Sequence, residues 1–335
     1  MLDNKLNILR RLVLVSILLA VVVVGLGAYA RLTNAGLGCP DWPGCYGLID
    51  VPQTSKQITA AEQAFPERPV EPQKAWNEMI HRYFAGSLGL LILAIALLSL
   101  KYRKNGSPVY LPLLLLLLVT FQAALGMWTV TMMLMPIIVM AHLLGGFTTL
   151  CLLFVLYLRL SPYRVPGGDE SVRKYARFGL FGVIILTAQI ALGGWTSSNY
   201  AALVCVELPI CQSGWLEQMT FDDSFDLIPP ERESYEFGYL PHADRVTIHI
   251  MHRFGAILTS LYLFWLAFMI FSKAHTQFFK KCAVSLASVL TVQLALGVSN
   301  IWFTLPLSVA VGHNVVAVCL MLVLITLTYS LKRKA

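Results

Sequence analysis

Four histidines stand in apolar sequence at a regular spacing. His81 and His142 are separated by the same interval as His252 and His313. A buried imidazole needs a partner, and a pair of neutral imidazoles on facing helices can bind one haem iron between them. The sequence therefore predicts two haem-iron sites. Zinc is a weaker candidate, because no segment collects enough Cys, His or carboxylate ligands at a suitable spacing.

The sequence around the histidines repeats with them. The shift that places His81-Arg82 on His252-Arg253 also places Gln122–Gly126 on Gln293–Gly297. A slightly smaller shift places Cys39 and Cys45 on Cys205 and Cys211. Similarity within one chain at this scale indicates a duplicated half. We expect residues 1–160 to hold the first histidine pair and residues 161–335 to hold the second.

The composition predicts that both halves lie in a membrane. Apolar residues make up 57% of the chain and charged residues 13%, whereas soluble domains average about 45–50% and about 25%. Apolar runs long enough to cross a bilayer recur along the chain. They cover residues 12–30, 79–100, 109–129, 136–159, 176–196, 245–271, 278–302 and 306–331. The expected fold class is an all-α integral membrane protein, with eight transmembrane helices arranged as two duplicated four-helix bundles.

The positions of the cations predict the orientation. Of the 25 Lys and Arg residues, 17 fall on one face of the expected topology. They are Lys5, Arg10, Arg11, Lys101, Arg103, Lys104, Arg159, Arg164, Arg173, Lys174, Arg177, Lys273, Lys280, Lys281, Lys332, Arg333 and Lys334. Such an excess marks the cytoplasmic side, so both termini are expected there. The net charge of +7 reflects this topology and does not indicate nucleic-acid binding. No Arg- and Ser-rich transit peptide precedes the first span, which favours a bacterial inner membrane.

Four cysteines fall in the two long segments on the opposite face, residues 31–77 and 197–244. The pairs Cys39/Cys45 and Cys205/Cys211 have the same close spacing. An oxidising periplasm would allow each pair to close as a disulfide within its own loop. Two interpretations remain open: a structural staple, or a redox-active disulfide near the site.

One position distinguishes the halves. The shift that aligns the histidines places Glu78 on His249, so Glu78-x-x-His81 in the first half corresponds to His249-x-x-His252 in the second. Residues three apart share a helix face, so Glu78 is expected to face the same site as His81. A carboxylate there could accept a proton or stabilise developing positive charge. The alternative is a glutamate that simply faces water. Arg82 and Arg253 are candidates for contacts with haem propionates, which suit the forked guanidinium.

Several motifs together resemble the haem A synthase family. They are Arg31-Leu-Thr-Asn-Ala-Gly-Leu37, Cys39-Pro-Asp-Trp-Pro-Gly-Cys45, Glu78-x-x-His81-Arg82, Gln122-x-x-Leu-Gly126, His142-x-x-Gly145-Gly146, His249-x-x-His252-Arg253 and Gly312-His313. The similarity runs through all eight expected spans. The end of the first span, Gly25-Leu-Gly27-Ala-Tyr-Ala30, departs from the usual Gly-Gly pattern of the family.

This resemblance implies an oxidoreductase that converts a ring methyl of haem O to a formyl group, giving haem A for cytochrome oxidase. It implies a substrate site at His81 and His142 with Glu78 as the catalytic carboxylate. It also implies a haem b cofactor on His252 and His313, a membrane electron donor or acceptor, and links to haem O synthase and oxidase assembly factors. A homo-oligomer is a further expectation.

Two alternatives explain the histidines in a different way. A diheme b-type electron-transfer cytochrome, linked to quinol, would need the same four ligands, because fold does not determine function. It would not explain why Glu78 replaces a histidine in one half. A haem transporter is a more distant alternative, since it would need a path to the other face.

Overall fold

The computed structural model describes residues 2–161 and 168–333 of the chain. These residues form helices joined by turns and loops, with no β-strand among them. Within the described residues, eight helices are long and apolar enough to cross a membrane, which confirms the predicted number. Their bounds are α1 (Leu2–Leu32), α3 (Pro72–Lys101), α4 (Tyr110–Thr131), α5 (Pro136–Leu160), α7 (Ala176–Ser198), α9 (His242–Lys273), α10 (Gln277–Trp302) and α11 (Leu307–Lys332). Arg164 and Lys334, two of the orienting cations, lie outside the described residues.

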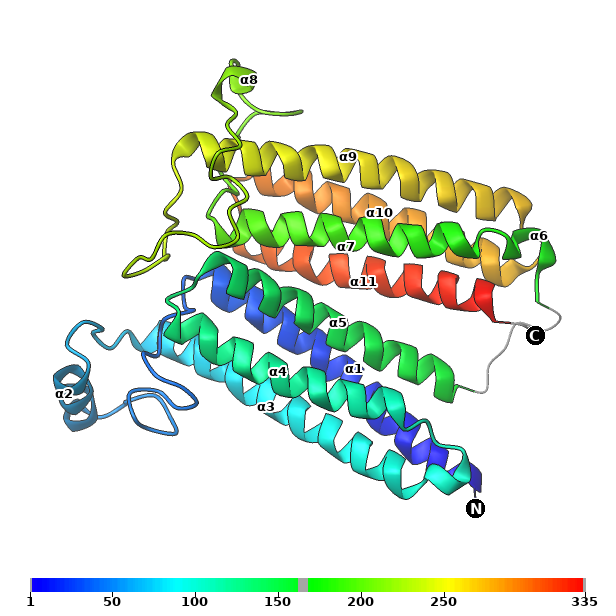
Figure 1. Cartoon of the computed structure of the whole chain (residues 1–335), viewed down its shortest axis with the longest axis horizontal. Helices are drawn as coiled ribbons and strands as arrows, with labels where there is room; N and C mark the ends of the chain where they lie inside the picture. The colour runs from blue at the N-terminus through cyan, green and yellow to red at the C-terminus, as the bar shows by residue number, and fades with distance from the viewer. Residues whose placement is uncertain (1, 162–167, 334–335) are drawn as a thin grey trace. The chain divides into compact units, whose positions relative to one another are not determined.

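The chain divides into two compact units. Unit 1 comprises Met1–Tyr157 and Leu227–Tyr239, and unit 2 comprises Leu158–Asp226 and Leu240–Ala335. In unit 1, α3 packs against α1 and α4, and α5 completes the set (Figure 1). In unit 2, α7, α9, α10 and α11 form a closed ring of neighbours in which α9 contacts α7 and α10, and α11 contacts the same two helices.

In the part of the chain that the structure describes, four short helices lie outside the spans, and they were not predicted. They are α2 (Ser55–Ala64), the 3₁₀ helix η1 (Arg103–Asn105), α6 (Glu170–Arg173) and α8 (Trp215–Gln218). Helix α2 begins with a capping box, in which Thr54 accepts from the N–H of Gln57 and the Gln57 side chain accepts from the N–H of Thr54. It lies in the first long loop (residues 33–71) and α8 lies in the second (residues 199–241).

Residues 227–239 come from the second long loop but pack within unit 1. The backbone N–H of Tyr235 donates to the carbonyl of Met133 over 3.0 Å, and Tyr235 is buried. Arg68 and Glu236 form an ion pair of 3.8 Å beside this contact. The first unit therefore includes a segment that the predicted boundary near residue 160 does not assign to it.

The turns at matching helix ends have matching backbones. Met133 and Leu134 between α4 and α5 have positive φ, as do Thr304 and Leu305, which occupy the equivalent positions between α10 and α11. The N–H of Leu134 donates to the carbonyl of Thr129 over 2.8 Å, and the N–H of Leu305 donates to that of Asn300 over 2.7 Å. The same local geometry thus accompanies the sequence repeat. Duplication of an ancestral half remains our interpretation of it.

Candidate functional site

The first histidine pair meets inside unit 1. His81 lies on α3 and His142 lies on α5, and their ring centroids are 6.4 Å apart with the ring planes at 82°. Each imidazole rests against a glycine of a neighbouring helix. A Cβ placed on Gly27 would lie 3.1 Å from Cε1 of His81, and one on Gly126 would lie 3.4 Å from Cε1 of His142. The missing side chain of Gly27 allows the His81 ring to pack closely, whereas a Cβ at Gly126 would reach only van der Waals contact with His142.

This geometry fits two axial ligands of one iron. Metal–imidazole nitrogen bonds are about 2.0–2.1 Å long, so two such ligands on opposite sides of one iron have ring centres roughly 6.3 Å apart. Nδ1 of His81 and Nδ1 of His142 are buried, and neither has a hydrogen-bond partner among the described residues.

In unit 2 the glycine contacts recur, and each histidine also lies beside a side-chain amide, that of Gln293 being 3.3 Å from Nε2 of His313. A Cβ on Gly193 of α7 would lie 3.1 Å from Cε1 of His252, and one on Gly297 of α10 would lie 3.2 Å from Cε1 of His313. The Gln189 amide also lies 3.0 Å from both Nδ1 and the carbonyl oxygen of His252. That side-chain amide holds the His252 ring in place, whereas Nδ1 of His81 has no hydrogen-bond partner among the described residues.

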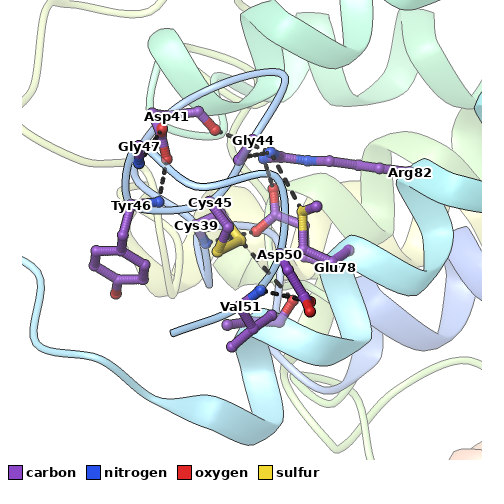
Figure 2. The surroundings of a disulfide bond; sticks show 12 residues. Cys39, Asp41, Gly44, Cys45, Tyr46, Gly47, Asp50, Val51, Glu78 and Arg82 are labelled. Atoms are coloured by element: carbon purple, nitrogen blue, oxygen red, sulfur yellow. Dashed lines mark hydrogen bonds and ion pairs between the residues drawn. A yellow bond between two sulfur atoms is a disulfide. The ribbon is translucent and has the colours of Figure 1, made fainter. Parts of the chain in front are cut away.

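Glu78 is buried beside the first pair and does not face water. Only 6% of the residue is exposed. Its Oε2 accepts the backbone N–H of Cys39 over 2.9 Å, and its Oε1 forms an ion pair with Arg82 one turn along α3 (Figure 2). The interpretation of Glu78 as a solvated residue at the mouth of a span is therefore wrong. A buried carboxylate with oriented donors has the character of a functional group.

The first long loop is held over Glu78 by a disulfide and by one guanidinium. Cys39 and Cys45 are bonded to each other, as predicted. Arg82 donates from Nη1 to the carbonyl of Asp41 over 3.0 Å and to the carbonyl of Gly44 (Figure 2). The Asp41 carboxylate accepts the N–H groups of Tyr46 and Gly47 over 2.6 and 2.7 Å. The disulfide closes residues 39–45 into a small loop, and Arg82 connects this loop to α3.

The second long loop has a similar anchor. Cys205 and Cys211 are bonded to each other, again as predicted. Arg253 donates from Nη2 to the carbonyl of Cys205 and from Nη1 to that of Glu207, each over 2.6 Å. Its Nε donates to Nε2 of His249 over 3.2 Å. His249 thus takes the place that Glu78 has in unit 1, as an acceptor for the arginine one turn along the helix.

The structure gives the two arginines roles that were not predicted. Nη1 of Arg82 donates to loop carbonyls, as do Nη1 and Nη2 of Arg253, and contact of either arginine with a propionate remains a prediction. The glycines that support His81 and His252 were also missed. Gly27 and Gly193 align at the smaller shift, which aligns the cysteines, whereas the histidines align at the larger one. An alignment of the two halves at both shifts would have shown that Gly27 and Gly193 repeat.

The fold and site define a multi-pass helical membrane protein with two internal histidine pairs, one accompanied by a buried carboxylate. The chain matches the COX15-CtaA family, described as Cytochrome oxidase assembly protein, over residues 10–325, and it belongs to that family. A protein named "Heme A synthase" from Shewanella oneidensis is 49% identical over 321 residues, covering 96% of each chain. A protein of the same name from Chelativorans sp. is 26% identical, covering 90% of this chain and 84% of its own length. Another, from Neorickettsia sennetsu, is 25% identical, covering 92% of this chain and 94% of its own length.

Proposed function

We propose that this protein is an oxidoreductase that converts a ring methyl of haem O to a formyl group, producing haem A for cytochrome oxidase. Family membership supports the link to oxidase assembly, and the relatives' name supports the product. Formally, the conversion of a methyl group and water to a formyl group releases four protons and four electrons. The site must therefore bind a haem, accept protons and pass on electrons.

The observation that carries this proposal is the arrangement of His81, His142 and Glu78. Two imidazoles at the separation expected for axial ligands have a buried carboxylate one helical turn from one of them. We assign the substrate haem to His81 and His142. Glu78 is the group that takes protons from the reacting methyl or stabilises positive charge on its carbon. Cys39 and Arg82 keep the carboxylate oriented.

The second pair holds the resident haem b in this proposal. His252 and His313 have no carboxylate at the position of Glu78, and the Gln189 amide fixes the His252 ring. Bound there, haem b would supply one-electron transfer during oxidation of the substrate. The protein's contribution is to position the haem and shield it, since each histidine lies among apolar helices and contacts a glycine of one of them.

We place the protein in a bacterial inner membrane with both termini cytoplasmic and both haem sites toward the periplasm. The cation distribution supports this orientation. The two disulfides support it as well, because such bonds persist in oxidising compartments. The partners implied are a haem O synthase, which supplies the substrate, oxidase assembly factors, and a membrane electron donor or acceptor.

Pigment analysis tests the proposal. Membranes that contain this protein together with a haem O synthase should yield haem A, and the purified protein should contain haem b. A matched membrane with the synthase alone should yield haem O. Haem b with no haem A under these conditions would indicate the diheme electron carrier in place of the enzyme.

A further inference from the structure

The two loop-anchoring arginines differ in how their charge is balanced. In unit 1, Arg82 forms an ion pair with the buried carboxylate of Glu78. In unit 2, the acceptor at the corresponding position is an imidazole, and Arg253 donates to it from Nε. Within the described part of the chain, Arg253 has no carboxylate partner.

The imidazole of His249 adds no negative charge. The guanidinium of an arginine keeps its hydrogens and cannot accept, so Nε2 of His249 must be the acceptor in this contact. The ring is then neutral, with its hydrogen on Nδ1, because a doubly protonated ring would have a hydrogen on each nitrogen. The Arg253–His249 pair therefore has a net charge of about +1, whereas the Arg82–Glu78 pair has a net charge of about 0.

The position of Arg253 makes an anion the missing partner. Arg253 immediately follows His252, and its side chain is partly buried against the second long loop. Loop carbonyls accept from Nη1 and Nη2, but these are neutral dipoles. A partly buried guanidinium without a counter-charge is costly, and a carboxylate that meets it in a low-dielectric site gains a charge-assisted hydrogen bond. A haem bound on His252 carries such carboxylates in its propionates.

We infer that Arg253 binds an ionised propionate of the haem held by His252 and His313, and that Glu78 denies the haem in unit 1 the equivalent contact. The inference rests on the proposed function and explains why one haem is retained and the other is released. A resident cofactor must be retained through many turnovers, whereas a haem that is modified must leave. The exchange of a carboxylate for an imidazole at one position gives unit 2 the retaining charge and leaves unit 1 without it.

A matched pair of variants at position 249 tests this inference. His249→Gln keeps a neutral acceptor for Nε of Arg253. The glutamate of His249→Glu has the same size as that glutamine but supplies the carboxylate found in unit 1. We expect purified His249→Glu protein to lose haem b to an excess of apomyoglobin about tenfold faster than wild type. His249→Gln should lose it at nearly the wild-type rate. Lys273→Gln, which makes the same charge change at the far end of α9, is the control for a general effect of charge.

The outcomes separate this inference from the function on which it rests. Equal rates of haem loss for His249→Glu and His249→Gln would overturn the inference while leaving haem b in place. Wild-type protein without haem b would overturn both. The unaltered protein offers an independent measurement in case His249→Glu does not fold. Its infrared redox-difference spectrum, with isotope-labelled propionates, should contain an ionised carboxylate, and signals from protonated propionates alone would contradict the proposal.

Discussion

The N–H of Cys39 donates to Oε2 of Glu78 over 2.9 Å, so the disulfide loop and the buried carboxylate are directly bonded. Arg82 strengthens the connection, because it pairs with Oε1 of Glu78 and also binds the carbonyl of Gly44 in the same loop. A Cβ at Gly44 would lie 2.1 Å from the carbonyl oxygen of Leu48, so the tight loop also depends on this glycine. The position of the carboxylate and the shape of the loop are therefore set together.

Glu78→Gln is expected to stop the chemistry while the protein still folds. The amide keeps the size of the side chain and an acceptor for Cys39, but it removes the charge that meets Arg82. General acid–base catalysis of this kind contributes about 10²–10⁴ in rate. Membranes with the variant should accumulate haem O or a partly oxidised haem and keep the haem b spectrum. Haem A at the wild-type rate would show that the carboxylate has no part in the reaction.

His252→Ala and His313→Ala should each abolish the low-spin b-type spectrum of the purified protein. Each variant removes one of two axial ligands, and a haem with one ligand becomes high-spin or dissociates. Optical and paramagnetic-resonance spectra measure this directly. The assignment of haem b to unit 2 fails if both variants keep the wild-type spectrum.

Substitution of the glycines that contact His252 and His81 tests which haem each half binds. Gly193→Ala places a Cβ 3.1 Å from Cε1 of His252, so the ring must shift by a few tenths of an ångström. We expect an altered low-spin spectrum of haem b, although alanine by itself favours a helix by about 1 kcal/mol. Gly27→Ala makes the same contact with His81, and it should impair haem A formation and leave that spectrum unchanged. Gly89→Ala, whose Cβ would meet nothing within 4 Å, is the control for both.

Double Cys39→Ser/Cys45→Ser protein tests the role of the first disulfide. Closing a ring of this length contributes about 2 kcal/mol in the chain-entropy account. Because Arg82 still anchors the loop, we expect lower stability with turnover per folded molecule retained. Thermal inactivation and haem A yield, both normalised to folded protein, give the two quantities. Normal stability with lost turnover would instead indicate a redox role.

Asp169 predicts a pH-dependent contribution to stability outside the membrane spans. Burial raises the pKa of its carboxyl, but hydrogen bonds from Ser171, from the N–H groups of Thr276 and His275 and from the Thr276 hydroxyl outweigh this and lower the pKa overall. A lowered pKa means that the stabilisation is present above the unfolded value, about 3.9, and is lost as the pH falls through the folded value. Asp169→Asn should cost about 1 kcal/mol at neutral pH. When the free energy of unfolding is measured against pH, the difference between the wild-type and Asp169→Asn proteins should disappear under strongly acidic conditions.

The spans and the loop disulfides were predictable from sequence because each depends on a local signal. Apolar runs indicate spans, and closely spaced cysteines in one loop can reach each other. The partners of Arg82 and Glu78 were not predictable, because Cys39 and Gly44 precede α3 by a long stretch of loop. The burial of Glu78 could be argued only from its helix face, and the loop that covers it has no periodic pattern.

The segment of residues 227–239 means that the gene cannot be divided at its internal repeat without loss. A fragment that ends near residue 160 would contain four spans and a histidine pair, but Met133 would lack the bond from Tyr235, and Arg68 would lack Glu236. Engineering that treats the first half as an independent module should therefore graft this segment onto it. Complementation between separately expressed halves would restore it in trans.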